Sequence, residues 1–313
     1  MSGLDKIFYL GVVIGITSRI IMLNLDQKQY PTQPNILLTQ IVLAFVASAL
    51  GALLVPALIA RSYTSITFLS LAADQFRQVR ESRRDTLQNM EDSQLVQRGD
   101  AFIEEIARTY EIRNYMCIIT SFLTVGLYYL IINEFKLDKT IAFIISGASG
   151  LLLAFILRKL LTRQTIGEIA DVVPVEISFV DEFIMQVGDL KGITNMGSKF
   201  DRDRYLSKGL GIEIIPKDKN YINAGIILDP GQRQTILYNI YSRIGIYREE
   251  NEPSFSPLPR RNPEKESLVI AYIPMEKDID KLIEAVKSCP ILSSARGKNL
   301  ALKNYKIGKK GSA

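Results

Sequence analysis

The chain has 313 residues, 47% of them hydrophobic, a formal charge of +5 and no histidine. Without histidine, Ser-His-Asp and Cys-His mechanisms are excluded, and we expect neither a metal nor another cofactor. The modest positive charge suits a protein beside anionic lipid and does not indicate nucleic acid as a partner.

Long apolar runs in the first half of the chain predict transmembrane helices. A hydrocarbon core of ~30 Å needs ~20 apolar residues in helical form. The first run could instead be a signal peptide, but Thr17-Ser18-Arg19 is a poor cleavage site and the run continues to Leu23, so we expect a retained helix. The predicted spans are residues 7–23, 36–60, 115–132 and 141–157.

Charged residues near these runs predict how the chain is oriented. Arg19 is the one ionised residue well inside a span, and such charges are costly and often functional, which makes it a candidate site residue. Alternatively, because it lies near the end of its run, we expect it to extend to the outer headgroups. Arginines are concentrated in residues 61–113, and Arg158 and Lys159 close the fourth run. The positive-inside rule therefore predicts that this long segment, the C-terminal domain and both termini are cytoplasmic.

The segment between the second and third spans predicts two helices. Apolar residues at 66, 69, 73, 76 and 79 describe an amphipathic helix that lies along the membrane surface or packs on the soluble domain. A second helix is predicted over residues 100–111, with Asp100 as its N-cap and Glu104 and Glu105 in its first turn.

Beyond the spans, residues alternate between strand-like and helix-like patterns. We predict strands at 171–180, 211–215, 221–228 and 268–273, and helices starting at Asp229-Pro230 and covering 277–288. Residues 253–263 read as a proline-rich linker, and the basic tail from residue 295 either binds anionic lipid or is a solvated end. Cys117 and Cys289 are expected to remain unpaired.

These patterns predict an α-helical membrane bundle of about four transmembrane helices, followed by a C-terminal α+β soluble domain. The parts are a first transmembrane hairpin (1–60), a cytoplasmic amphipathic helical segment (61–114), a second transmembrane hairpin (115–161) and the cytoplasmic α+β domain with its basic tail (162–313).

Gln232 and Arg233 fall in the first turn of the helix that Asp229-Pro230 begins. Helix N-termini bind anions readily, so a ligand or partner contact at this turn is our local site hypothesis. The alternative is a polar helix start that only caps itself.

Several segments resemble the YIEGIA family, which is named for a short sequence in the long loop. Here that sequence reads Gly99-Asp100-Ala101-Phe102-Ile103-Glu104-Glu105-Ile106-Ala107, with phenylalanine in place of the motif tyrosine and Glu105 in place of the motif glycine. Further similar segments are Gln29-Tyr30-Pro31, Leu50-Gly51-Ala52, Pro56-Ala57-Leu58, residues 68–77, Gly231-Gln232-Arg233-Gln234 and residues 256–261.

The resemblance implies a membrane protein of endospore-forming bacteria that is linked to sporulation. Some relatives are described as having a small partner, a capping-complex subunit, and a membrane-bound protease role has been suggested for the family. The candidate partner contacts are Phe102, Glu104, Ile106, Gln232 and Arg233.

Three functions remain open. A membrane scaffold or regulator would engage a protein partner through its cytoplasmic domain, with a homo-oligomer as an open alternative. A membrane-anchored protease without histidine would need a serine, threonine or carboxylate arrangement, and none can be located in the sequence. A transporter is disfavoured because few polar residues lie inside the spans. We prefer the scaffold, with the protease as its alternative.

Overall fold

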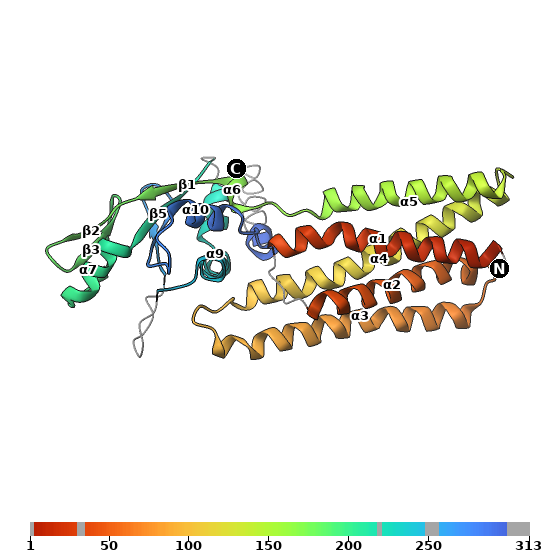
Figure 1. Ribbon diagram of the computed structural model, residues 1–313, viewed down its shortest axis with the longest axis horizontal. Coiled ribbons are helices and arrows are strands. Elements are labelled where there is room, and N and C mark those ends of the chain that lie inside the picture. Colours follow the sequence, from red (N-terminus) through yellow and green to blue (C-terminus); the bar gives the residue numbers. More distant parts are fainter. Residues whose placement is uncertain (1–2, 30–34, 218–220, 248–256, 299–313) are drawn as a thin grey trace, which may run out of the picture. The chain divides into compact units, whose positions relative to one another are not determined.

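The computed structural model describes residues 3–29, 35–217, 221–247 and 257–298, which fall into two compact units (Figure 1). Unit 1 comprises residues 1–86 and 106–162, and unit 2 comprises residues 87–105 and 163–313. Each unit is described by itself.

Unit 1 is helical. Its helices are α1 (Gly3–Gln29), α2 (Asn35–Ile59), α3 (Tyr63–Asn89), α4 (Asp100–Asn133) and α5 (Lys139–Leu161). The last residues of α3 and the first residues of α4 are assigned to unit 2. Within the described residues, α1, α2, α4 and α5 are long and apolar enough to cross a membrane. This confirms the four apolar runs that the sequence predicts, as helices of membrane-spanning length.

The predicted helix at 100–111 and the predicted third span form one continuous helix, α4, of 34 residues. Nothing between Glu111 and Tyr115 is a helix breaker, so the helical backbone continues through the change from polar to apolar sequence. Because α4 begins at Asp100, this residue lies inside the first turn and is not the N-cap, and Glu104 and Glu105 lie beyond that turn.

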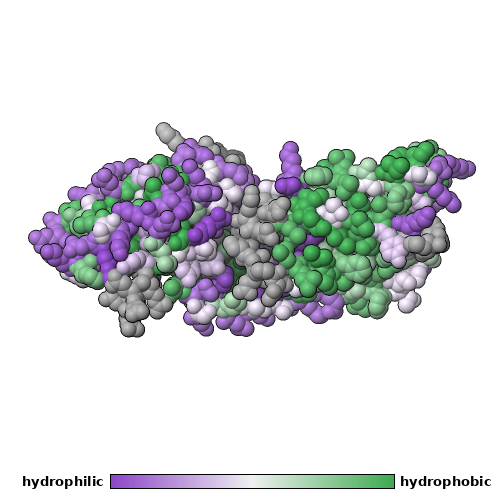
Figure 2. Space-filling view, viewed as in Figure 1, coloured by the Kyte–Doolittle hydropathy of each residue, from purple (hydrophilic) through white to green (hydrophobic). Residues whose placement is uncertain are grey.

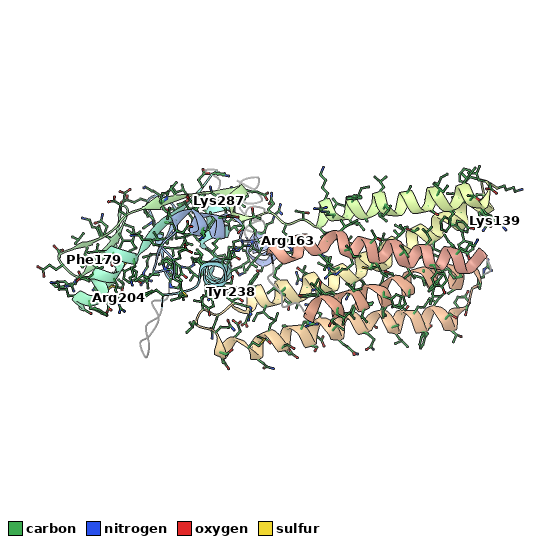
Figure 3. The ribbon with its side chains drawn as sticks, viewed as in Figure 1. Lys139, Arg163, Phe179, Arg204, Tyr238 and Lys287 are labelled. Carbon is green, nitrogen blue, oxygen red and sulfur yellow. The ribbon has the colours of Figure 1, made fainter. Side chains whose placement is uncertain are left out.

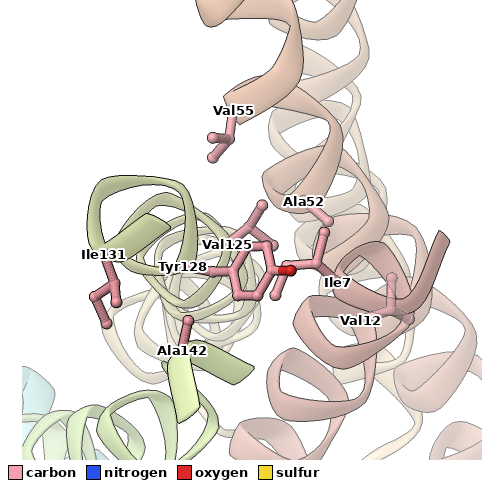
Figure 4. Packing of buried hydrophobic residues seen from close by; sticks show 8 residues of the cluster. All are labelled: Ile7, Val12, Ala52, Val55, Val125, Tyr128, Ile131 and Ala142. Carbon is pink, nitrogen blue, oxygen red and sulfur yellow. The ribbon is translucent and has the colours of Figure 1, made fainter. Parts of the chain in front are cut away.

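Small residues bring the helices of unit 1 close together. A Cβ added to Gly51 would lie 2.3 Å from the Ile118 carbonyl oxygen, and one added to Gly150 would lie 2.1 Å from the Thr124 hydroxyl. One apolar cluster joins the start of α1 to the end of α2, the end of α4 and the start of α5 (Figure 4). Its buried members are Ile7, Val12, Ala52, Val55, Val125, Tyr128, Ile131 and Ala142.

Large apolar side chains also cover the outside of unit 1, where Figure 2 shows a hydrophobic surface. Leu38 on α2 and Ile144 and Leu152 on α5 are more than three-fifths exposed. An apolar surface of this extent is unfavourable in water and matches the hydrocarbon of a bilayer.

Arg19 does not extend outward as the sequence predicts. Its side chain is 2% exposed, and Nη2 donates to Gln40 Oε1 at 2.8 Å. Gln40 Nε2 in turn donates to the Tyr110 hydroxyl at 3.4 Å. A guanidinium with polar partners inside the bundle has no need to reach the headgroups, so α1, α2 and α4 are joined by a polar layer at this level.

The predicted apolar face of α3 is confirmed, because Phe76 is buried and Ile66, Leu69 and Ala73 are half-buried. The structure also shows what covers this face. Phe76 packs in one cluster with Ala44, Ala47 and Cys117 of α2 and α4, so α3 lies on the helical bundle of unit 1.

Unit 2 contains two antiparallel sheets. The first has the order β1-β5-β7-β6 and the second the order β2-β3-β4. The strands are β1 (Ala170–Val175), β2 (Ile177–Val180), β3 (Ile184–Val187), β4 (Leu190–Asn195), β5 (Leu210–Pro216), β6 (Leu258–Asn262) and β7 (Ser267–Tyr272). The side chains of β7 are all buried, which makes this strand the centre of the unit's core.

Helices cover these sheets. They are η1 (Glu91–Ser93), α6 (Ile166–Ile169), α7 (Lys199–Lys208), α8 (Tyr221–Leu228), α9 (Pro230–Ile244) and α10 (Ile279–Lys287). Asp229 caps α9 and the apolar face of α10 is buried, as the sequence predicts. Unit 2 is therefore the expected α+β arrangement, and both cysteines are free thiols.

Two strand predictions and one linker prediction in unit 2 are wrong in detail. Residues 171–180 form parts of β1 and β2, which break at Glu176 and belong to different sheets. Residues 221–228 form the helix α8, because a short apolar run fits either structure. Residues 258–262 of the predicted linker form β6, and Pro259 is tolerated there because β6 is an edge strand. Residues 30–31, 253–256 and most of the basic tail lie outside the described residues.

Candidate functional site

Two of the family-like segments meet in unit 2, where the start of α4 packs on α9. The Phe102 ring lies 5.9 Å from the Tyr238 ring, centroid to centroid, and Figure 3 labels Tyr238 on α9. A Cβ added to Gly231 would lie only 2.9 Å from the Ala101 Cβ. The segment 99–105 and the segment 231–234, far apart in sequence, therefore form one contact region, which we call the motif seam.

A buried carboxylate fixes the turn that leads into α4. Glu91 accepts from Arg98 Nη1 at 3.0 Å and from the Gly99 backbone N–H at 3.1 Å. Gly99 has φ +81°, a left-handed conformation that glycine adopts without strain. The Arg98 guanidinium also lies 4.9 Å from the Tyr238 ring centre, so it faces both an anion and an aromatic ring.

A second carboxylate, Glu105, joins α4 to residues far along the chain. It forms an ion pair with Arg163, which Figure 3 labels. It accepts from the Ser293 hydroxyl at 3.0 Å and from the Ser293 backbone N–H at 3.3 Å. Arg163 Nη1 donates to the same hydroxyl oxygen at 2.8 Å.

Gln232 on α9 is fully buried and both ends of its amide are engaged. Nε2 donates to the Pro290 carbonyl at 3.0 Å, and Oε1 accepts from the Leu292 N–H at 2.8 Å. The Asp229 side chain accepts from the N–H groups of Gly231 and Gln232 at 3.0 and 3.3 Å. The helix start thus caps itself with its own carboxylate, which is the alternative to the predicted anion contact.

Burial raises the pKa of two groups around the seam. It raises the pKa of the Tyr238 hydroxyl, an effect that Arg98 partly opposes. It also raises the pKa of the Cys289 thiol, which is fully buried near Gln232. Both groups are therefore neutral at physiological pH, and Cys289 is a poor nucleophile in the folded protein.

The structure brings four of the five predicted contact residues into or beside the seam. Phe102 and Gln232 are buried, whereas Glu104 and Arg233 are half-buried and keep exposed surface. Ile106 is buried and is assigned to unit 1. The sequence reasoning missed the other groups of this region. Tyr238 packs on Phe102, Pro290 and Leu292 bond Gln232, and the neighbouring Glu91 and Glu105 hold Arg98, Arg163 and Ser293.

A cleft of about 530 Å³ opens elsewhere in unit 2. It lies between the end of β1, α7, the start of β5 and the start of α10, and Figure 3 labels Arg204 on the adjoining α7. Leu206 lines it and is 53% exposed. Lys277 lines it too, with Nζ donating to the Ser207 carbonyl at 2.8 Å. The cleft offers an apolar side chain, a cation and the backbone of an edge strand, β1.

A family model described as the YIEGIA protein matches residues 7–302. The chain belongs to the YIEGIA family. It is also 33% identical over 291 residues to YphB of Bacillus subtilis (strain 168), a match that covers 91% of each chain. No solved structure matches the chain.

The YIEGIA motif thus forms the first turns of α4 and packs on α9. Where the motif has a tyrosine, Phe102 retains the ring that packs against Tyr238. Where it has a glycine, this chain places Glu105, and its carboxylate holds Arg163 and Ser293. The first residues of the motif are an internal contact of unit 2, in which the Glu105 carboxylate fastens the start of α4.

Proposed function

We propose that this YIEGIA protein is a multi-pass membrane scaffold or regulator that acts during sporulation and engages a protein partner through unit 2 on the cytoplasmic side. The family resemblance implies a protein of endospore-forming bacteria, and the four apolar helices support membrane embedding. A small capping-complex subunit is the partner that the family resemblance favours.

The observation that carries this proposal is that the polar groups in and beside the motif seam form hydrogen bonds within the fold. Glu91 and Glu105 each accept from a guanidinium and from a backbone N–H, and the Gln232 amide bonds two backbone groups. Groups held this way stabilise a fold, whereas a catalytic acid or base must present a lone pair or proton to a substrate. The motif therefore serves to build unit 2.

The partner contact is then expected on the exposed surface of unit 2. The cleft beside α7 presents Leu206 and Lys277 to solvent, and Glu104 and Arg233 remain as candidate contacts at the seam. Apolar anchors with a charged rim are the usual make-up of a protein interface.

A photo-crosslinking amino acid at Leu206 in sporulating cells tests this contact. We expect one defined crosslinked product at Leu206 and none at Phe183, an exposed aromatic residue of unit 2 that does not line the cleft. Leu206→Asp, in a chain with the photoprobe at Lys277, should abolish the product. Equal crosslinking from both positions would reject the cleft as the contact.

A second candidate is a membrane-anchored protease, and the observation that favours it is Ser293. Its hydroxyl lies at the surface and donates to the Glu105 carboxylate at 3.0 Å, an arrangement of a hydroxyl and a base. Against it, the same carboxylate also accepts from Arg163 and from the Ser293 N–H. Ser293→Ala decides between them: a protease would lose its activity toward its targets, whereas a scaffold would keep partner crosslinking from Leu206.

A further inference from the structure

The packing of unit 1 fixes at which end of the bundle each helix begins and ends. The cluster around Tyr128 joins the start of α1, the end of α2, the end of α4 and the start of α5 (Figures 1 and 4). We call this the turn end, because it also holds the short α4–α5 turn. Towards the opposite end, which we call the polar end, Arg19 in the second half of α1 contacts Gln40 in the second turn of α2, and Gln40 contacts Tyr110 in the first third of α4.

These two ends impose a condition on the chain. The α2 helix finishes at the turn end, and α4 starts from the polar end. If α2 and α4 both cross the bilayer, the residues that connect them must cross it as well. A topology with four crossings would need α4 to start where α2 finishes.

The connecting segment follows the required path. Three residues separate the end of α2 at Ile59 from the start of α3 at Tyr63. Thirteen residues later, Phe76 packs with Ala44 and Ala47 in the interior of α2, and Arg80 Nη1 then reaches Glu111 Oε2 at 3.1 Å. From Tyr63 to Arg80 a helix extends ~26 Å, close to the ~30 Å of a hydrocarbon core.

The outer face of this part of α3 has the chemistry of a lipid-facing surface. Tyr63, Phe68 and Leu71 are 77%, 71% and 60% exposed, and residues 62–73 contain no charged residue. The hydroxyls of Thr67 and Ser70 donate to the carbonyls one turn earlier, each at 3.0 Å, so they need no water. The neighbouring α2 also exposes large apolar side chains, among them Phe45 and Leu53.

We propose that α3 between Tyr63 and Arg80 is a fifth membrane crossing whose outer face, with Phe68 at its centre, contacts lipid hydrocarbon. This rests on the membrane embedding proposed above and replaces the expectation that residues 61–114 are wholly cytoplasmic. Asp74 and Arg77 flank Phe76 as an i,i+3 pair, and the long Arg77 side chain can extend toward the headgroups at the polar end.

The consequence concerns the N-terminus. With five crossings, α1 starts on the side opposite to the one where α5 ends and unit 2 follows. The charges agree, since Arg77, Arg80, Arg83, Arg84, Arg158 and Lys159 fall toward the polar end, and Lys6, Arg61, Lys136 and Lys139 toward the turn end. The positive-inside rule then keeps the C-terminal domain cytoplasmic and places the N-terminus outside.

Single cysteines in the full chain, with Cys117→Ala and Cys289→Ala, test this in intact cells with a membrane-impermeant sulfonated maleimide. Arg61→Cys in the α2–α3 turn and Lys136→Cys in the α4–α5 turn should both be labelled before permeabilisation. Thr86→Cys, past the polar end of α3, should be labelled only afterwards. Ser62→Cys repeats the first reading while keeping Arg61.

Labelling of Lys136→Cys in intact cells, with Arg61→Cys and Ser62→Cys protected until permeabilisation, would overturn the fifth crossing. Protection of all positions until lysis would instead overturn membrane embedding itself, so the two failures are distinguishable. Oxidative crosslinking of Phe68→Cys to a second copy, or to another protein, would assign the outer face of α3 to a helix and reject lipid as its contact. Its absence, with labelling by a lipid-soluble maleimide only, is the expected result.

Discussion

Replacing Gly231 with alanine should loosen the motif seam, and the effect should be reversed by a second substitution. The added Cβ would lie 2.9 Å from the Ala101 Cβ, and neither atom can move without its helix. Overpacking of this kind costs ~1–3 kcal/mol, from which the better helix propensity of alanine subtracts up to ~1 kcal/mol. We therefore expect Gly231→Ala to destabilise unit 2 by about 1 kcal/mol.

The reciprocal change gives the decisive comparison. Ala101→Gly alone should cost about 1 kcal/mol as a glycine in a helix. In the double variant the close contact is gone and the two propensity changes cancel, so its stability should match that of the wild type. The sum of the single effects then exceeds the double effect by about 2 kcal/mol, which is the coupling expected of residues in direct contact.

Urea unfolding of the full chain in lipid nanodiscs measures this coupling, with pulse labelling of the buried Cys289 thiol as the readout in a Cys117→Ala background. With a slope of ~2 kcal/mol/M, the coupling corresponds to about 1 M in summed midpoint shifts. Gly197→Ala is the matched control, because nothing lies within 4 Å of its added Cβ. Additive effects of Gly231→Ala and Ala101→Gly would refute the contact between the motif and α9.

Three further predictions concern other parts of the chain. Gly51→Ala places a Cβ 2.3 Å from the Ile118 carbonyl and should lower the thermal aggregation temperature of the protein in detergent. The Lys281 backbone N–H, which the Asp278 carboxylate caps, lowers the pKa of Asp278. The stabilisation of unit 2 by this carboxylate is therefore present above about pH 3.8 and is lost as the pH falls through the lower folded-state pKa. In urea titrations, Asp278→Ala should be less stable than the wild type at pH 7 and resemble it near pH 2. Cys289, buried and with a raised pKa, should react with iodoacetamide only as unit 2 unfolds, even at pH 9.

Each of these has a specific contrary outcome. Gly126→Ala is the control in the membrane unit, since its added Cβ meets only Val55 at 3.9 Å, and equal effects at positions 51 and 126 would refute the close helix contact. For Asp278, a stability difference that is constant from pH 2 to pH 7 would exclude the carboxylate as its source. Labelling of Cys289 at the rate of an exposed cysteine would contradict its burial.

The sequence predicts the helices that carry a strong periodicity, and its failures have identifiable causes. The uncharged spans and the Asp229-Pro230 start of α9 depend on local chemistry, and both are found. Residues 221–228 were predicted as a strand because eight largely apolar residues carry no decisive period, whereas packing makes them α8. Of the small sheet β2-β3-β4 the pattern predicts only the residues of β2, because its strands are short and interrupted by polar residues.

The candidate site was predictable only in part. The resemblance drew attention to Phe102 and Gln232, and the structure places both in the motif seam. Their partners follow from tertiary contacts over long sequence separations, such as Gln232 with Leu292, 60 positions apart. One sequence without aligned relatives holds no signal for such a pair. The sequence does not indicate α3 as a membrane crossing for a related reason. Amphipathicity predicts that a helix has a buried face, but not which elements cover that face.

The most direct test of a scaffold role is a quantitative proteome comparison of sporulating cells that carry a deletion of the gene, complemented with wild type, Leu206→Asp or Ser293→Ala. We expect Ser293→Ala to restore the wild-type proteome. Leu206→Asp should leave a specific protein missing from the membrane fraction, as in the deletion, while the total level of that protein is unchanged. If instead Ser293→Ala and the deletion both accumulate the same few proteins at constant transcript levels, the chain is a protease and the scaffold proposal is wrong.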